Sequence, residues 1–542
     1  MNVGFGIDLG TTRTSIGMVA PNLPDRGWYG NAQVITLSDG PMTPSVVLFE
    51  PNTHTVGMPA KNQGHLARDC AQLFKRQMSD ADWRFSPPAR PGMSYSAEDV
   101  SAVLLRHVAE SAASMTGLEV HDVVVTVPAY FGEPERRRTR SAAEQAGLEV
   151  LDIINEPTAA MLSYLFQQGV ALDDAGVLVF DLGGGTFDTV VVQVSGNSVT
   201  VASIDGDLLL GGQDFDSTIS LALAEKFGRK YPDADLPTAE AGARARLMLS
   251  VETARESLSA TERANIPVWG SGESAGLSMN VELRRAEMES QVDELIGKCL
   301  AIAERALDNA RRQGTEPTKV LFVGGMTRTP SIRNRVLEKF GLEELKVGAD
   351  PDLAVTKGAA IWAQKLLFEK ELLAKLGLDA VSEIDWDSDE VQSQIRQFAV
   401  RTSFPRSMVA RLLRLDLRSI TSRGYAIRCY SPERDEAFLS YLIRSGDRLA
   451  FRSDPKDYSW IDEASSWVLR LYEDLPEKRG ARSPDDARLV ETIRGAMVTK
   501  RPAGSDFQVV LEMGLDQIIK IEAWHSDDRG KEDRLDVEIK PH

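Results

Sequence analysis

Two glycine-rich turns in this sequence each follow a short apolar run that ends in an aspartate. They are GIDLGTT at residues 6–12 and FDLGGGT at residues 180–186, and each precedes a second apolar run, at 15–19 and 187–194. Glycine lets backbone N–H groups approach an anion closely, threonine adds hydroxyl donors, and an aspartate at a strand end suits Mg²⁺ held largely through water. One such turn alone is most often an ordinary β-turn, but two matched copies favour a pair of hairpins that clamp a triphosphate from opposite sides.

A third glycine turn completes the set of candidate ligand-binding loops. Gly324 and Gly325 follow the strand-like run 320–323, and Pro330, a favoured early helical residue, comes shortly after them. A strand, two glycines and a helix in succession suit a nucleoside, although this pattern by itself is weak. No Gly-x-x-x-x-Gly-Lys-Ser/Thr loop occurs in the chain, so the sequence does not predict a Walker-type phosphate loop.

The elements that would position these turns alternate between strands and helices over about the first 370 residues. Short apolar runs at 123–127 and 177–180 predict buried strands, and residues 284–312 and 353–376 predict helices. Because the aspartate-glycine turn recurs with the same strand pattern around it, the economical interpretation is a duplicated half-domain with one hairpin in each half.

The C-terminal part of the chain has a different pattern. From about Leu412 onward, Leu413, Leu415 and Leu417 alternate with charged residues, and this period of two predicts β-strands. A hairpin connection is expected at 514–517, between two of the further strand-like runs, which are 467–472, 507–512, 518–523 and 535–539. We therefore expect an all-β unit here.

Composition narrows the classes of function. The chain has 542 residues, with 62 Lys and Arg against 80 Asp and Glu and a net charge of −18. This excess repels phosphate backbones and anionic membranes, so we expect no nucleic acid and no membrane as partner. The sequence predicts neither a secretory signal nor a membrane span, which would need about 20 apolar residues. Cys70, Cys299 and Cys429 form no metal-ligand spacing and suit a reducing compartment, so we expect a cytoplasmic protein.

Seven motifs in this order resemble one family, the seventy-kilodalton heat-shock chaperones or DnaK-like proteins. They cover about residues 3–367 and are GIDLGTT, VVVTVPAYF, IINEPTAA, VFDLGGGTFD, LLGGQDFD, FVGGMTRTP and PDLAVTKGAA. The resemblance implies an α/β actin-like ATPase fold with duplicated ribonuclease-H-like halves at 1–385, a linker region at 386–418, and an all-β sandwich-like polypeptide-binding domain at 419–542. No helical lid is recognisable before His542, so the chain is identified as an atypical member that lacks the lid.

The resemblance also implies roles for individual residues, with ATP or ADP and Mg²⁺ as cofactors. Lys75 matches the lysine that helps to hold the attacking water and the γ-phosphate. Such a lysine suits hydrolysis, which requires positioning of the water and neutralisation of phosphate charge rather than covalent chemistry. The implied catalytic residues are Lys75, Glu156, Asp181, Thr186 and Asp8, and those implied to hold Mg²⁺, largely through water, are Asp8, Asp181 and Asp188. The implied nucleotide-binding residues are Gly10, Thr11, Thr12, Arg13, Gly183, Gly184, Gly185, Gly211, Gly212, Glu252, Arg255, Ser259, Gly324, Gly325, Met326, Arg328 and Asp352.

Three positions depart from the family pattern. An adenine-stacking arginine of many members would fall at Glu256, directly after Arg255, and a family serine falls at Met326. We therefore expect base recognition to differ from that of ordinary members. Asp152 stands where an arginine typically meets J-domain helper proteins, and this charge reversal argues against the usual contact with a J-domain co-chaperone.

The function implied by the resemblance is that of an ATP-dependent chaperone-like protein. It would bind and hydrolyse ATP and couple nucleotide state to polypeptide binding in the C-terminal β domain, with an unfolded or dedicated client polypeptide and a nucleotide-exchange factor as partners. Two alternatives stay open: an ATP-binding interaction module with negligible turnover that serves a dedicated partner, and a small-molecule kinase on the same fold. The kinase would need a sugar-binding insertion and a base for the accepting hydroxyl, and we identify neither in the sequence.

Overall fold

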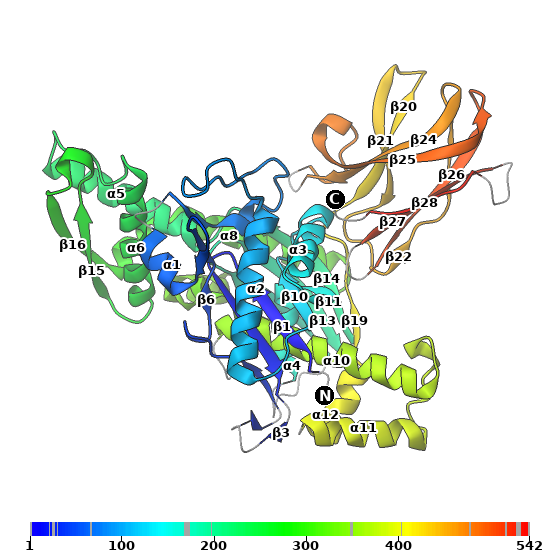
Figure 1. Ribbon diagram of the computed structural model, residues 1–542, viewed down its shortest axis with the longest axis horizontal. Helices are drawn as coiled ribbons and strands as arrows, with labels where there is room; N and C mark the ends of the chain where they lie inside the picture. The colour runs from blue at the N-terminus through cyan, green and yellow to red at the C-terminus, as the bar shows by residue number, and fades with distance from the viewer. Residues whose placement is uncertain are drawn as a thin grey trace.

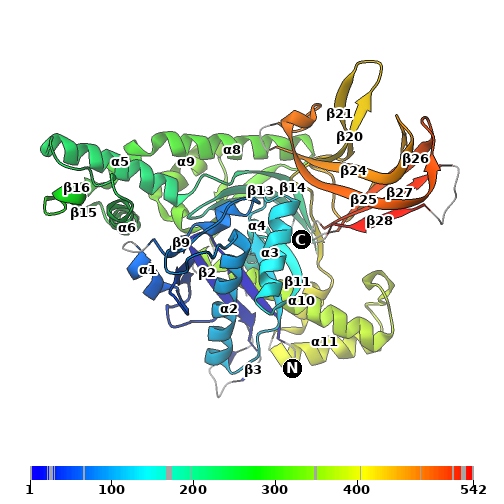
Figure 2. The same cartoon turned by 45° about the horizontal axis from the view of Figure 1, so that its top comes forward.

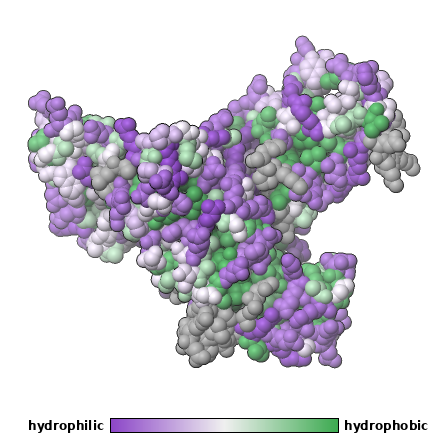
Figure 3. Space-filling view, viewed as in Figure 1, coloured by the Kyte–Doolittle hydropathy of each residue, from purple (hydrophilic) through white to green (hydrophobic). Residues whose placement is uncertain are grey.

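The chain divides into an α/β part, residues 3–418, and a β part, residues 419–539, which projects from it as a separate arm (Figure 1). The space-filling view shows an open notch between this arm and the opposite arm of the α/β part, with a largely hydrophilic surface on both (Figure 3). The computed structural model describes residues 3–20, 22–23, 28–29, 31–64, 68–166, 174–196, 198–346, 351–402, 404–475, 478–514, 518–526 and 533–539.

Two mixed β-sheets form the centre of the α/β part. The first has the strand order β11-β10-β1-β2-β5, with β6 beside β2, and its strands are β1 (Phe5–Leu9), β2 (Arg13–Val19), β5 (Ala32–Val34), β6 (Thr43–Pro44), β10 (Asp122–Val127) and β11 (Glu149–Asn155). The second has the order β18-β17-β12-β13-β14-β19, and its strands are β12 (Ala175–Leu182), β13 (Phe187–Ser195), β14 (Ser198–Asp207), β17 (Pro317–Val323), β18 (Glu343–Glu344) and β19 (Asp416–Arg418).

The two predicted glycine turns join antiparallel hairpins, β1–β2 in the first sheet and β12–β13 in the second. In both sheets the first strand of the hairpin also pairs in parallel with a strand from later in the chain, β1 with β10 and β12 with β17. Asp8 and Asp181 therefore stand at equivalent strand ends, where each chain enters its turn. The near-continuous apolar character of these strands follows from burial on both faces.

Helices α4 (Glu156–Leu165) and α10 (Ala354–Leu376) pack against each other between the two sheets, and α10 matches the helix predicted at 353–376. The outer layer includes α1 (Met58–Gly64), α2 (Ala97–Thr116) and α3 (Glu133–Gln145) on one side. On the other side, α5 (Gly212–Lys230), α6 (Ala241–Leu258) and the hairpin of β15 (Arg263–Trp269) and β16 (Ser278–Arg284) form the second arm (Figure 1).

The helix predicted at 284–312 is interrupted. The structure has α7 (Arg285–Gln291) and α8 (Asp293–Arg312), because Val292 leaves the helical region with φ −105° and ψ 13°. Met288, Val292 and Ile296 are all buried in one apolar cluster, so core packing redirects the chain at a point where local propensity favours a continuous helix. Helix α9 (Pro330–Phe340) begins at the predicted proline.

The stretch predicted as a linker region holds two helices and a short strand. They are α11 (Asp389–Thr402), α12 (Arg406–Leu413) and β19. The prediction that the alternating pattern begins at Leu412 is wrong for Leu412 and Leu413, because these two leucines share a buried helical face with Val409. Strand formation starts only at Asp416, where β19 adds to the edge of the second sheet in parallel with β14.

The β part contains two antiparallel sheets around one apolar core that includes Tyr425 and Trp467. The first sheet, in the order β21-β20-β24-β25, comprises β20 (Tyr425–Ser431), β21 (Glu436–Ile443), β24 (Ala464–Asp474) and β25 (Ala487–Arg501). The second comprises β22 (Phe451–Arg452), β23 (Lys456–Ser459), β26 (Asp506–Met513), β27 (Ile519–His525) and β28 (Leu535–Glu538). The predicted strands are present, and of the connection predicted at 514–517, residues 515–517 lie outside the described part of the chain.

The β part meets the start of α3 through buried charged residues, a contact that we call the seam. It comprises residues 130–137 of the α/β part with Ser422, Arg423, Tyr425, Glu473 and Arg488 of the β part. Arg488 bonds both carboxylate oxygens of Glu135, at 2.8 and 3.1 Å, and also pairs with Glu473. Among the helices in the described ranges, none has the length and apolarity that crossing a membrane requires.

Candidate functional site

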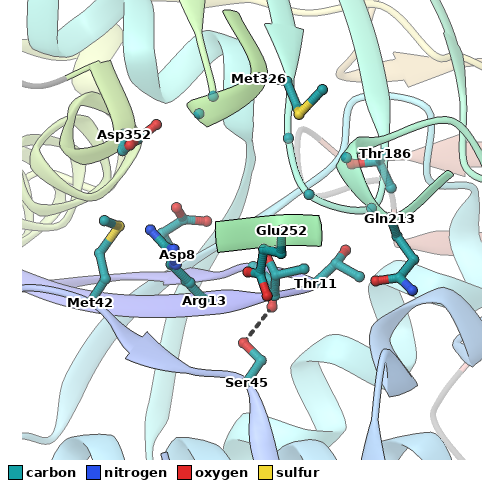
Figure 4. Close-up of a pocket in the computed structure, with 18 of the residues that line it drawn as sticks. Asp8, Thr11, Arg13, Met42, Ser45, Thr186, Gln213, Glu252, Met326 and Asp352 are labelled. Atoms are coloured by element: carbon teal, nitrogen blue, oxygen red, sulfur yellow. Dashed lines mark hydrogen bonds between the residues drawn. The ribbon is translucent and has the colours of Figure 1, made fainter. Parts of the chain in front are cut away.

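A cavity of about 400 Å³ lies between the two halves of the α/β part, each built around one of the two central sheets. We call this cavity the cleft. Both predicted hairpin turns line it, together with the third glycine turn after β17 and one face of α6. Figure 4 shows side chains from both halves turned toward the same space, with Thr11 and Arg13 on one side and Thr186 and Met326 on the other. The sequence-predicted loops are thus brought together by the two sheets.

The two hairpin turns touch each other at their tips. A Cβ on Gly184 would collide with the side chain of Thr12, and one on Gly185 would collide with that of Thr11. Only glycine therefore allows the turns to approach this closely, which leaves their backbone N–H groups bordering the cleft. The Ser45 hydroxyl donates to the Gly10 carbonyl at 2.7 Å and fixes the first turn (Figure 4).

The third glycine turn also depends on backbone freedom. Gly324 has φ 82°, in the left-handed region, and a Cβ there would collide with the backbone of Leu182 at the end of β12. Gly325 follows and faces Asp352, which accepts a hydrogen bond from Arg328 at 3.0 Å. This turn therefore lies directly beside the strand end that carries Asp181.

The floor of the cleft carries more buried negative charge than positive charge. Lys75 Nζ contacts Glu156 Oε1 at 2.5 Å, and the lysine side chain is only 2% exposed. Burial raises the pKa of Asp8 to about 7, helped by the nearby Glu156 and opposed by Lys75. Burial, followed by repulsion from Glu156, also raises the pKa of Asp181 well above its usual value and that of Asp188 to about 8.

This charge distribution suits a bound cation and a phosphate chain. In the described ranges, no three His, Cys, Asp or Glu side chains are grouped so that they could hold a metal ion directly. Carboxylate oxygens are nevertheless the ligands that Mg²⁺ accepts, and Mg²⁺ commonly keeps several waters and adds phosphate oxygens. The raised pKa values of Asp8 and Asp181 mean that ionising these groups is costly until a cation compensates them, so the residues present fit Mg²⁺ held through water.

Helix α6 closes the cleft on the opposite side through ion pairs. Glu252 pairs with Lys61 of α1 at 2.8 Å, and Glu256 pairs with Arg13 of β2 at 2.5 Å. Both pairs cross from one half of the α/β part to the other. Arg255 is held by Asp216 of α5 at 2.6 Å, and this pair is largely buried. The charged side chains of α6 are therefore already engaged within the protein.

Most residues predicted for the site line the cleft, but two do not. Gly211 lies at the N-terminal end of α5, directly before the lining residue Gly212, and Asp188 lies behind the lining, where its Oδ1 accepts from the Tyr130 backbone N–H at 3.0 Å. Sequence reasoning missed Lys61, Ser45, Asp216, Met42 and Gln213, all of which line the cleft. The individual roles of the predicted residues stay predictions.

Comparison with protein families identifies the chain. A family description named Hsp70 protein matches residues 75–382, which is more than half of the 542 residues. This chain belongs to the Hsp70 family. The family predicted from the seven motifs is thus confirmed, and with it an actin-like ATPase fold for the matched part.

Members of the Hsp70 family are ATP-binding chaperones and ATPases that use ATP or ADP with Mg²⁺ and bind client polypeptides and co-chaperones. The positions that depart from the family pattern have structural partners here. Glu256 forms the cross-cleft pair with Arg13, and Met326 is buried in the apolar cluster under α5 and α6. Asp152 Oδ2 accepts from Trp362 Nε1 of α10 at 2.8 Å, so its carboxylate contributes to internal packing.

Proposed function

We propose that this Hsp70-family chain hydrolyses ATP with Mg²⁺ in the cleft and couples nucleotide state to polypeptide binding by the β part. The observation that carries the proposal is the meeting of two glycine hairpin turns, tip to tip, above the buried Lys75–Glu156 pair and the strand-end carboxylates Asp8 and Asp181. Backbone donors, a buried cation and cation-holding carboxylates are the components that phosphoryl transfer to water requires.

The chemistry follows from the charges at the cleft floor. Lys75 places positive charge where the γ-phosphate of a clamped nucleotide would lie, and Glu156, held against it at 2.5 Å, accepts a hydrogen bond from the attacking water and orients it. Asp8 and Asp181 orient the water shell of the metal. When bound, Mg²⁺ neutralises charge on the phosphate oxygens.

Two structural routes connect the cleft to the β part and support the proposed coupling. In the first, Asp188 accepts from the Tyr130 N–H at 3.0 Å, and the Tyr130 carbonyl accepts from Arg423 of the β part, also at 3.0 Å. In the second, β19 pairs with β14, which neighbours the strand that begins at the second glycine turn.

The ATPase proposal is tested by calorimetric titration with ATP and ADP and by steady-state release of phosphate. We expect stoichiometric binding and measurable turnover with Mg²⁺. Binding without turnover would support the alternative in which the chain is an ATP-binding interaction module, and absence of binding would contradict both. Both measurements use the wild-type chain, so neither depends on a variant that folds poorly.

The coupling proposal is tested with Leu415→Asp. Leu415 is 6% exposed and packs with α12 directly before β19, so a buried aspartate there should displace the connecting segment. We expect peptide-stimulated ATPase activity to be lost while nucleotide binding stays near normal. Asp416→Asn, at an exposed position next in the chain, is the matched control. Undiminished stimulation in Leu415→Asp would show that this segment does not transmit the signal.

A further inference from the structure

A second cavity, of about 410 Å³, lies where the α/β part, the connecting segment and the β part come together. We call it the junction cavity. Helix α8 runs toward the β part (Figure 2), and residues of its C-terminal turn border the cavity. Ile420 and Thr421 at the start of the β part, the turn after β21 and the end of β14 also contribute to the lining. Its volume lies within the range of small-molecule sites, about 300–1,000 Å³.

The junction cavity carries positive charge from both parts of the molecule. Its lining includes Arg312 at the end of α8, Arg444 after β21 and Arg479 after β24. Arg312 and Arg444 form no ion pair or side-chain hydrogen bond with any residue of the described chain, and Arg444 only stacks over Tyr441, at 5.9 Å. Arg479 is held to the α/β part, where it contacts Tyr130 Oη and the Ile204 carbonyl, each at 3.4 Å, and pairs with Asp205 at 4.0 Å, so its charge is partly compensated.

Asp474, the one carboxylate among the described residues that line the cavity, forms no ion pair with Arg312 or Arg444. Asp474 accepts hydrogen bonds from the backbone N–H groups of Gly424 and Gly480, each at 3.1 Å, and from the Tyr441 hydroxyl. Its oxygens are therefore already hydrogen-bonded by uncharged donors from its own surroundings. Two of the last carbonyls of α8 are also bonded, since the N–H groups of Gln313 and Thr315 donate to the Ala310 carbonyl and that of Gly314 donates to the Arg311 carbonyl, each at 3.0 Å.

We propose that the junction cavity binds a small organic dianion that carries carboxylate or phosphate groups. In a chain with a net charge of −18, two unpaired guanidinium groups facing one cavity stand out against the overall charge. A guanidinium offers paired N–H donors in a planar fork that matches carboxylate and phosphate oxygens. The side-chain amides of Asn309 and Gln313 supply uncharged donors for the rest of the ligand.

Such a ligand would act on the arrangement of the two parts as well as bind to it. Arg312 belongs to the α/β part and Arg444 to the β part, so a dianion that contacts both is bound only while the two parts remain together. A ligand that binds one arrangement and not another stabilises the arrangement it binds. The dianion is therefore an effector that favours the docked β part, a regulation separate from the proposed ATP hydrolysis.

The test uses the full chain with the cleft filled by Mg²⁺ and a non-hydrolysable ATP analogue, so that phosphate cannot enter the γ-phosphate position. Succinate and inorganic phosphate are titrated separately by calorimetry, and the two titrations distinguish a dicarboxylate ligand from a phosphate ligand. We expect saturable binding near one equivalent for one of the two probes. Arg312→Ala and Arg444→Ala should each weaken it by about tenfold or more, since each removes a charge-assisted contact.

Arg428→Ala is the matched control, because Arg428 is an exposed arginine of β20 outside the cavity. Both tested arginines are exposed, so the variants should fold, and thermal melts of the ligand-free proteins verify this. Absence of saturable binding by either probe overturns the proposal, as does binding that Arg312→Ala and Arg444→Ala leave unchanged. If the ATP analogue fails to bind, the proposed function fails. The succinate titration without nucleotide still tests the junction cavity with the same variants.

Discussion

The cleft and the seam both bury charged side chains, yet they balance those charges differently. At and just behind the floor of the cleft, Asp8, Asp181, Asp188 and Glu156 outnumber the buried cations Lys75 and Arg136. In the seam, Glu135 and Glu473 share Arg488, and Arg423 stacks at 4.3 Å over the Tyr130 ring. The cleft thus has an excess of acid, whereas the seam pairs its acids with arginines.

The pKa shifts show the difference most clearly at Glu135. Burial raises the pKa values of Asp8, Asp181 and Asp188 because nothing nearby compensates all of their charge. In the seam, desolvation of Glu135 is outweighed by Arg488 together with Arg423, so the pKa of Glu135 is lowered, whereas burial raises the pKa of Glu473 despite the same arginines. Buried charge without a partner is costly, so a protein keeps it where a ligand supplies the missing charge. The comparison teaches that the cleft is arranged for a bound cation and the seam for contact between the two parts.

The largest effect that would test this contrast is expected from Arg488→Ala. This substitution leaves Glu135 and Glu473, both 2% exposed, buried without their shared partner. Breaking a buried ion pair by removing one member costs about 3–5 kcal/mol. Urea unfolding followed by the fluorescence of the buried Trp467 measures the loss of stability. Arg494→Ala, at an exposed position on the same strand, should change little, and a similar small change for Arg488→Ala would mean that the seam is not held by its charges.

In the cleft, the corresponding substitution should affect chemistry rather than stability. Asp181→Asn removes one of the unbalanced carboxylates, so the fold should be retained or become more stable. Because that carboxylate is proposed to orient the metal's water shell, phosphate release should fall by about 100–1,000-fold, as when other preorganised electrostatic groups are removed. Asp379→Asn, at an exposed position after α10, is the control. Wild-type turnover in Asp181→Asn would contradict the proposed site.

Glu133, like Glu473, is a member of the seam whose pKa is raised as in the cleft. Burial raises its pKa from 4.5 to about 7, and Glu473 and Glu135 add to this, while Arg137 and Arg488 oppose it. The docked state therefore favours protonated Glu133, so its contribution to docking is complete below about pH 4.5 and is lost as the pH rises through about 7.

Docking of the β part should consequently weaken between about pH 4.5 and 7, and Glu133→Gln should reduce this dependence by about 1–3 kcal/mol. Fluorophores placed on the two parts report docking by energy transfer. Cleft carboxylates titrate in the same range, so the informative quantity is the difference between wild type and Glu133→Gln. Identical pH profiles for the two proteins would show that Glu133 is not responsible.

The sequence predicts the cleft better than the seam for a physical reason. Asp8 and Asp181 lie in local strand–turn–strand patterns, where residue types largely determine the backbone path. Lys61 and Ser45 reach the cleft only through tertiary packing, and no local pattern distinguishes them from other polar residues, whereas Asp216 ends the motif LLGGQDFD and could have been noticed there.

The same distinction applies to the fold. Alternation and apolar runs locate the strands, including those of the β part, but core packing decides where the helix predicted at 284–312 is interrupted and why Leu412 and Leu413 are helical. The contact between Glu135 and Arg488 joins residues 353 positions apart. A pairing at that separation depends on how the two parts dock, and single-sequence periodicity contains no signal for it.

The smallest effect is expected at the Arg13–Glu256 pair, where the cleft, like the seam, pairs a carboxylate with an arginine. This pair crosses the opening of the cleft. The pair measures 2.5 Å, but its side chains are 36% and 47% exposed, so solvent screens it. Exposed pairs contribute about 0.2–1 kcal/mol, which corresponds to at most about a fivefold change in a rate. Glu256→Gln and Arg13→Gln should each speed dissociation of a fluorescent ATP analogue to this extent, and added salt should reduce the difference.

The charge-swapped double variant, Arg13→Glu with Glu256→Arg, should restore slow dissociation. Lys61→Gln, which breaks the second ion pair across the cleft, serves for comparison. Glu256→Arg alone separates two physical accounts, since it opposes Arg13 but offers a guanidinium that could stack on a base. Faster dissociation in that variant would support the ion pair as the interaction that slows nucleotide release. Slower dissociation would show that base stacking outweighs the ion pair.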